Sequence, residues 1–189
     1  IMVLPWLCSE NSEEFMELVN KSTSTILAGH LELDGFEMMQ GVRATHGMDK
    51  KVFDKFDLVL SGHYHTKSTQ GNIHYLGTQY QLTWADAADE KHFHVFDTDT
   101  RELTPIHNPD KIFYKLNYDE NNQPKIDNRY KNCYIKAIIL NKKDLYAFDQ
   151  WYDKLNKVEP FEVRVIENFE EYLGENVDDD GVDTVDTSS

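Results

Sequence analysis

The chain has 189 residues, of which 40% are hydrophobic, and a formal net charge of −15 at pH 7; these values fit one domain, or one domain with a small appendage, and exclude a disordered chain. Its apolar runs are far shorter than the roughly 20 residues that span a bilayer, and its first ten residues lack the features of a signal peptide. The two cysteines, Cys8 and Cys133, show no CxxC spacing, which favours a reducing cytoplasmic compartment over a disulfide scaffold.

Strands and helices are predicted to alternate over the first third of the chain, in the order β-α-β-α-β. Parallel strands that are joined by helices end at one edge of a sheet, where the following loops collect functional groups. His30 and His63 both fall at that edge. The expected elements are a strand over 1–8, a helix over 9–21 that begins at Asn11 or Ser12, a strand over 24–30, a short helix over 47–56 and a strand over 57–63.

The apolar pattern changes to a period of two from Asn72 onward, which predicts antiparallel strands of a second sheet. These strands are expected over 72–77, 80–84, 92–97 and 101–108. The polar stretch 109–131 is predicted to be a linker or a long loop, and therefore a domain boundary.

A single β-α-β unit is predicted within the following subdomain, 132–173. It consists of a strand over 133–140, a helix over 142–158 and a strand over 161–167. The helix is expected to place Leu145, Phe148, Tyr152 and Leu155 on one side. The remaining segment, 174–189, is acidic and poor in apolar residues, which predicts a mobile tail.

The clearest chemical signal is the segment LVLSGHYHTKS, in which an apolar strand is followed by Gly62, His63, Tyr64 and His65. Glycine permits a sharp exit from the strand, and two imidazoles on the irregular turn that follows can point to adjacent positions. Two metal ions about 4 Å apart require ligands arranged in this way. An ordinary pair of loop histidines is the competing interpretation.

A second segment, TILAGHLELDGF, has the same order of apolar strand, glycine and histidine, at Gly29 and His30. Two equivalent strand ends would then deliver histidines to the same edge of the sheet. Neutral imidazole is a suitable ligand for manganese, iron or zinc, with carboxylates completing the coordination. A polar residue that caps a turn is the competing interpretation for His30.

These segments, together with YLGTQYQLTWAD and FHVFDTDTREL further along the chain, resemble the calcineurin-like metallophosphoesterases. The resemblance is to their nuclease branch for double-strand-break repair, which contains SbcD and the recombination endonuclease subunit of large tailed bacteriophages. It implies an α/β fold: the C-terminal portion of a metallophosphoesterase αββα sandwich over 1–108, and a small β-α-β capping or DNA-recognition subdomain over 132–173.

The resemblance also implies a site with two divalent metal ions, manganese or alternatively magnesium, that hydrolyses DNA phosphodiesters. In that family His30 and His63 would bind one ion, and His65 the other. The family motifs Asp-x-His, Gly-Asp and Gly-Asn-His are absent from the sequence, so we assign no catalytic residue. We therefore expect a fragment that is truncated at its N-terminus, with incompletely coordinated ions and no activity.

The partners that the resemblance implies are DNA, the coiled coil of an SbcC-like ABC-type ATPase subunit, and a second copy of the intact chain. The expected location is the cytoplasm, that of the host if a phage encodes the protein. The net charge does not by itself indicate DNA, because phosphate binding normally relies on Lys and Arg. Segment 175–189 contains six acids and no base, yet the remainder is also acidic, so DNA binding would need a limited basic face, bound cations or a partner.

Weaker candidates for the site have simpler interpretations as well. Tyr64 lies between two candidate ligands and could shape the substrate edge. Asp34 and Glu32 could orient a histidine or be solvated loop acids, and Lys67 and Arg43 could meet DNA phosphates or be solvated. His92 and His94 share one face of a strand and are more simply surface histidines than a second metal site, and His46, His74 and His107 are interpreted as turn or strand residues.

Two other functions remain open at this point. The GH and GHxH motifs occur in every branch of the superfamily, so a phosphomonoesterase or a cyclic-nucleotide phosphodiesterase is the nearest alternative. A module without catalytic function, which binds a partner or DNA through the capping subdomain, is the alternative from another class.

Overall fold

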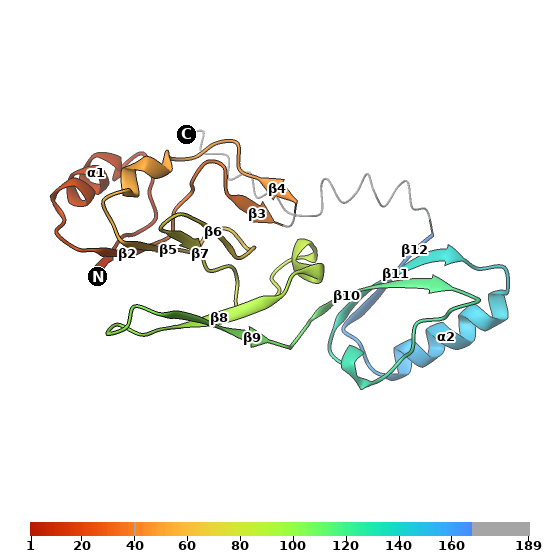
Figure 1. Ribbon diagram of the computed structural model, residues 1–189. Coiled ribbons are helices and arrows are strands. Elements are labelled where there is room, and N and C mark those ends of the chain that lie inside the picture. The colour runs from red at the N-terminus through yellow and green to blue at the C-terminus, as the bar shows by residue number, and fades with distance from the viewer. Residues whose placement is uncertain (40, 168–189) are drawn as a thin grey trace. The chain divides into compact units, whose positions relative to one another are not determined.

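The computed structural model describes residues 1–39 and 41–167. They form two compact units, one from Ile1–Tyr80 with Asp89–Pro109 and the other from Gln81–Ala88 with the described residues after Pro109. The first unit holds the candidate site, and Figure 1 shows the elements of both. The predicted tail, 174–189, lies outside the described residues, as does the end of the predicted subdomain. No helix among the described residues is long and apolar enough to cross a membrane.

The first unit is built on a five-stranded sheet with the order β1-β2-β5-β7-β6. The first four strands in this order are parallel, and β6 is antiparallel to β7. The strands are β1 (Met2–Val3), β2 (Ile26–Gly29), β5 (Leu58–Ser61), β6 (Ser68–Gln70) and β7 (Ile73–Tyr75). Two antiparallel hairpins accompany the sheet: β3 (Glu37–Met39) with β4 (Val42–Arg43), and β8 (Lys91–Phe96) with β9 (Leu103–Asn108).

Helix α1 (Ser12–Lys21) follows β1 and buries Phe15 and Val19, which lie one helical turn apart. It begins after Asn11, as predicted, although the Asn11 side chain makes no capping hydrogen bond to the helix. At the other end, the Lys55 ammonium donates hydrogen bonds to the carbonyls of Val19, Asn20 and Ser22. A cation is favourable there because the carbonyls at the end of a helix lack partners and carry partial negative charge.

The short helix expected over 47–56 is present as η1 (Lys50–Phe53), which has the 3-10 form.

The sheet of the first unit differs from the prediction in the length of one strand and in the pairing of another. The expected strand over 1–8 is reduced to the two residues of β1. The segment 72–77 does not begin a second sheet, because β7 pairs in parallel with β5 in the first one. A period of two shows that a segment is a strand with two different faces, but it does not specify the neighbouring strand.

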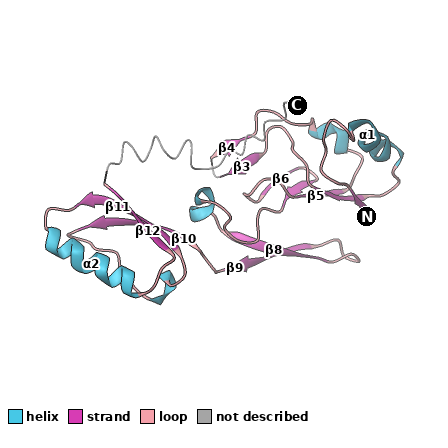
Figure 2. Cartoon of the chain, turned by 180° about the vertical axis from the view of Figure 1, so that it is seen from behind, coloured by secondary structure: helices cyan, strands magenta, loops and turns pink. Residues whose placement is uncertain are grey.

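The second unit contains a three-stranded parallel sheet with the order β10-β11-β12. Its elements are β10 (Phe113–Asp119), η3 (Asn128–Tyr130), β11 (Tyr134–Asn141), α2 (Leu145–Lys157) and β12 (Glu162–Ile166). Helix α2 packs on one face of the sheet, as Figure 2 shows from behind. The predicted strand, helix and strand of the β-α-β unit are confirmed.

Strand β10 lies inside the stretch 109–131, which the sequence indicated to be a linker or long loop. Its buried residues, Leu116 and Tyr118, alternate with the exposed Lys115 and Asn117. The polar half of this alternation merges with the polar residues that follow, so the strand was missed.

The predicted buried side of α2 was also partly wrong. Trp151 is buried in the core, whereas Leu145, which was expected on the buried side, is 61% exposed.

The segment 80–84 was expected to be a strand, but it leads into the 3-10 helix η2 (Trp84–Ala88) of the second unit. Buried polar side chains hold this turn. The Asp86 carboxylate accepts hydrogen bonds from the backbone N–H groups of Leu82 and Thr83. Such local bonding of an aspartate to backbone donors competes with strand formation, which the alternation of residue types does not reveal.

Candidate metal centre

His30 and His63 follow the neighbouring parallel strands β2 and β5, whose last residues, Gly29 and Ser61, are paired in register. The structure therefore brings the two imidazoles to one edge of the sheet, as predicted. Their ring centroids are 5.3 Å apart and the rings are close to perpendicular. Trp6 lies against both rings, with centroid distances of 5.3 Å to His30 and 4.7 Å to His63.

The backbone around His63 is adapted to bring the two rings together. His63 has a φ of 83°, a left-handed conformation that costs energy for any residue with a Cβ and is often found at functional sites. A Cβ atom at Gly62 would lie 2.8 Å from Nδ1 of His30, so a side chain there would displace the imidazole. Glycine is thus required by the close approach of the backbone to His30.

The electrostatic environment favours the neutral form of His63. Burial is the main cause that lowers the pKa of His63; Glu32 opposes this effect, and the neighbouring His30 and His65 reinforce it. A neutral imidazole keeps a lone pair on one ring nitrogen, which is the form that binds a metal ion. The nearby Glu32 carboxylate adds negative charge beside the imidazoles, which favours a bound cation.

Three buried hydroxyl groups hold the loop that follows His30. Ser61 Oγ accepts a hydrogen bond from the N–H of Leu31, at 3.0 Å. The Tyr75 hydroxyl donates to the carbonyl of Leu31, at 2.8 Å, and accepts from the N–H of Leu33, at 3.1 Å. The Tyr64 hydroxyl donates to the carbonyl of Leu33, at 3.0 Å. The bonds of Ser61 and Tyr64 connect β5 and the turn after it to the loop after His30, and those of Tyr75 connect this loop to β7. Together they hold the loop that follows one candidate ligand.

Replacing Tyr75 with Phe is expected to lower the free energy of unfolding by about 2 kcal/mol, because the N–H of Leu33 and the carbonyl of Leu31 lose a buried partner. Denaturant unfolding of the chain measures this change, with Tyr146→Phe as the control, since the Tyr146 side chain is 72% exposed. Equal stability of the two variants would contradict the role of the Tyr75 hydroxyl in holding the loop.

The other candidate residues take different positions. Tyr64 is buried, with 3% of its surface exposed, and stacks on Tyr75; this position favours a structural role over the expected one at the substrate edge. Asp34 and Lys67 are exposed. His65 is half-buried, and its carbonyl accepts hydrogen bonds from the N–H of Thr78 and from the Lys91 ammonium.

Two residues near the site were not recognised in the sequence. Trp6 lies in the opening apolar run, where it was interpreted as part of a buried strand. His46 was interpreted as a simple turn residue, yet its Nε2 lies 3.1 Å from Oε1 of Glu32, a residue that was expected either to orient a histidine or to be a solvated loop acid. The Gly-His signal could not reveal either contact, because both depend on how the loops fold back to the sheet edge.

A cavity of about 260 Å³ adjoins this edge, lined by Trp6, Leu7, His30, Leu31, Glu32, Leu33, Gly47 and Met48. Its donor types, imidazole and carboxylate, suit a divalent transition-metal ion. Among the described residues, however, no three His, Cys, Asp or Glu side chains are grouped closely enough to hold a metal ion. The imidazole and carboxylate groups are therefore suitable metal ligands, but the described residues supply only part of the coordination that a metal ion needs.

Burial also lowers the pKa of His74 and His94, as it does for His63. In the unfolded chain these imidazoles have their ordinary pKa of about 6.5 and take up protons as the pH falls through that value. In the folded chain they take up protons only at lower pH. Protons therefore favour the unfolded state, and the midpoint of thermal unfolding should fall as the pH is lowered from 7 to below 6. His74→Gln should reduce this pH dependence of the unfolding midpoint, whereas His107→Gln, at an exposed position, should leave it unchanged. The same change of midpoint with pH in the unaltered chain and in both variants would contradict this account.

No protein-family model matches the chain. Exonuclease subunit 1 of Enterobacteria phage T4 is 32% identical over 157 residues, which cover 82% of this chain and 45% of that protein. The SbcD subunit of nuclease SbcCD from Staphylococcus saprophyticus is 24% identical over 131 residues, which cover 63% of this chain and 35% of that protein. The chain spans less than half the length of these curated relatives.

Proposed function

The chain is a relative of the SbcD-like nuclease subunits of phages and bacteria, and from this relationship we propose that the complete polypeptide hydrolyses phosphodiester bonds of DNA in recombination and double-strand-break processing. The observation that supports this proposal is the approach of His30 and His63 at the ends of two parallel strands. The left-handed backbone of His63 and the glycine that leaves room for the imidazole of His30 also support a functional role for this pair.

In this proposal His30, His63 and His65 are ligands of two divalent ions, manganese or alternatively magnesium. Such ions, when bound, stabilise charge on the phosphate and lower the pKa of a water molecule. The residues of this chain contribute the orientation of the ligands. Ser61 and Tyr75 fix the loop after His30, and Trp6 covers one side of both imidazoles.

The remaining metal donors would come from outside the described residues, because these contain no sufficient group of ligands. Because the family motifs Asp-x-His, Gly-Asp and Gly-Asn-His are absent from residues 1–189, we propose that this chain alone is inactive. We further propose an SbcC-like ATPase subunit as partner, a homodimer of the complete polypeptide, and a cytoplasmic location.

The proposal is tested by incubating the complete polypeptide with linear and circular DNA, with manganese or with a chelator. Release of nucleotides or nicks only with the metal is the expected result. Hydrolysis of small phosphomonoesters or cyclic nucleotides without attack on DNA would instead support the other metallophosphoesterase activities.

A further inference from the structure

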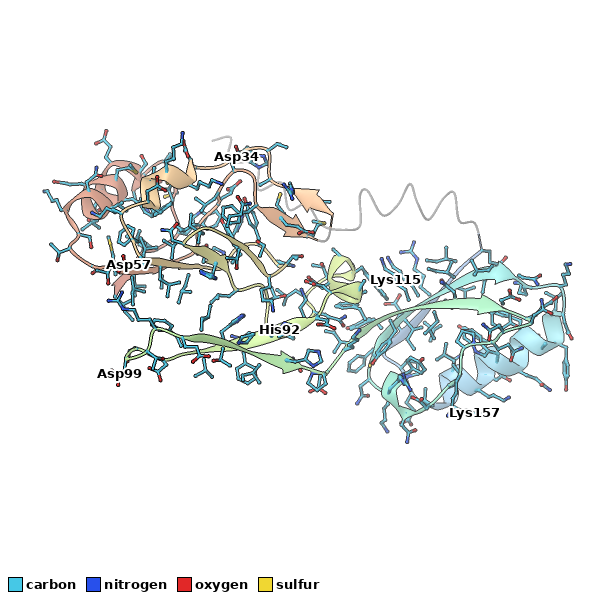
Figure 3. All side chains as sticks on the ribbon, viewed as in Figure 1. Asp34, Asp57, His92, Asp99, Lys115 and Lys157 are labelled. Carbon is cyan, nitrogen blue, oxygen red and sulfur yellow. The ribbon has the colours of Figure 1, made fainter. Side chains whose placement is uncertain are left out.

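A second cavity of the first unit, of about 300 Å³, is lined by residues of β6 and β7 and of the β8–β9 hairpin. Its volume is at the lower end of those that hold small molecules in proteins. Figure 3 labels His92, which lies on the same strand and the same face as the lining residue His94. None of the lining residues is a candidate metal ligand. They are Lys67, Ser68, Thr69, His74, Tyr75, Leu76, His94, Leu103 and Pro105.

The charged and titratable groups of this cavity are of the kind that binds anions. Its lining contains one lysine and two histidines but no Asp or Glu, although Asp and Glu outnumber Lys and Arg in the chain by 34 to 19. Within residues 1–39 and 41–167, the side chains of Lys67 and His94 form no hydrogen bond or ion pair. The positive charge of Lys67 is therefore not balanced by a carboxylate in the cavity, and it would attract an anion.

The pairing of β6 with β7 places two of the polar groups side by side. Thr69 is paired in register with His74, and Thr69 Oγ1 lies 3.2 Å from Nδ1 of His74. This contact orients the imidazole and leaves Nε2 as the ring nitrogen that can bind a ligand. Lys67 immediately precedes β6 and lines the same cavity.

His94 contributes a second imidazole from the hairpin. Burial is the main cause that lowers the pKa of His94, and Lys67, His92 and His74 lower it further. On β9, His107 lies against His92, with a centroid distance of 5.5 Å. The titratable groups around His94 are therefore all bases. A bound anion would oppose their effect and raise the pKa of His94, and the protonated imidazole can donate a hydrogen bond from either nitrogen.

We propose that this cavity binds the phosphate group of a small molecule, with Lys67 as the ionic partner and with hydrogen bonds from His74, His94 and the Thr69 hydroxyl. Hydrogen bonds between charged groups are stronger than neutral ones, which suits a lysine and two imidazoles that can take up protons. The proposal goes beyond the nuclease function and does not depend on it.

The apolar part of the lining distinguishes two sources of the phosphate group. Leu76, Leu103 and Pro105 provide this part. An organic monophosphate would place its organic part on these side chains and gain affinity from their burial, whereas inorganic phosphate would use the polar groups alone. Tighter binding of thymidine 5′-monophosphate than of inorganic phosphate, at pH 7.5, would identify an organic monophosphate as the ligand, and equal binding would identify free phosphate.

The test is a titration of the chain with sulfate in metal-free buffer at constant ionic strength, followed by NMR of the histidine ring signals. Sulfate keeps its two negative charges between pH 6 and 7.5, so a change of affinity with pH comes from the protein. The signals of His74 and His94 should shift to saturation, whereas that of the exposed His46 should not. Binding should be at least about twofold tighter at pH 6 than at pH 7.5, because an anion favours the protonated imidazoles.

Lys67→Gln is expected to weaken sulfate binding roughly tenfold, the effect of losing one hydrogen bond between charged groups. Lys67 is exposed, so the fold should be retained. The matched control is Lys154→Gln, which removes the same charge from an exposed position of α2 and should leave the affinity nearly unchanged.

Three results would overturn the proposal. They are the absence of saturation, equal effects of Lys67→Gln and Lys154→Gln, and binding of an oligonucleotide without a terminal phosphate as tight as that of thymidine 5′-monophosphate. Binding is measured without metal, so failure here is distinguishable from failure of the proposed nuclease activity, which requires the metal and the complete polypeptide.

Discussion

Replacement of His63 by Ala in the complete polypeptide is expected to reduce metal-dependent DNA hydrolysis by on the order of 100-fold or more. Loss of a residue that only orients a metal ligand typically costs 10- to 100-fold, and His63 is proposed to be a ligand itself. It lies 5.3 Å from His30, between ring centroids, and burial lowers its pKa. The variant should also contain less bound metal after desalting.

His107→Ala is the matched control, because it removes an exposed imidazole from the β8–β9 hairpin, away from the strand ends that carry the candidate ligands. This variant should retain both activity and metal. Circular dichroism of both variants separates loss of the site from loss of the fold. Full activity and normal metal content in His63→Ala would rule out His63 as a ligand.

Replacement of Gln81 by Met is expected to destabilise the second unit by about 3 kcal/mol, because several buried backbone groups lose their partners. Gln81 is 1% exposed. Its Oε1 atom accepts hydrogen bonds from the N–H groups of Ile112 and Phe113, and its amide donates to the carbonyls of Asp86 and Ala87. A methionine of similar length can fill the space but satisfies none of these groups.

Denaturant unfolding, monitored by the fluorescence of the tryptophans, measures this loss. Gln79→Met is the control, because the Gln79 side chain is exposed and should change stability little. A change below about 1 kcal/mol in Gln81→Met would show that the hydrogen bonds between η2 and the start of β10 contribute little to the fold.

The helices and strands with strong local patterns could be predicted from the sequence. Phe148 and Leu155 mark the buried side of α2, and the apolar runs before His30 and His63 become β2 and β5. The parallel arrangement also follows from the alternation of strands and helices. These features are local, so the order of residues along the chain is enough to indicate them.

The features that were missed depend on contacts between distant parts of the chain. Strand β7 joins the first sheet because β5 offers it a free edge, and Gln81 belongs to the second unit because it bonds to residues about thirty positions later. In the site, the meeting of His30 and His63 was predicted, whereas the burial of Tyr64 was not. Its hydroxyl reaches a carbonyl of the opposite loop, which no spacing in the sequence indicates.

The imidazoles of His30, His63 and His65 are proposed to bind the metal of a nuclease. The most direct test is pulsed electron paramagnetic resonance of the complete polypeptide with bound manganese, which detects histidine nitrogen coordinated to the ion. We predict nitrogen coupling in the unaltered protein and a weaker coupling in His63→Ala. Manganese bound without nitrogen coupling, in a protein that still cleaves DNA, would contradict the account.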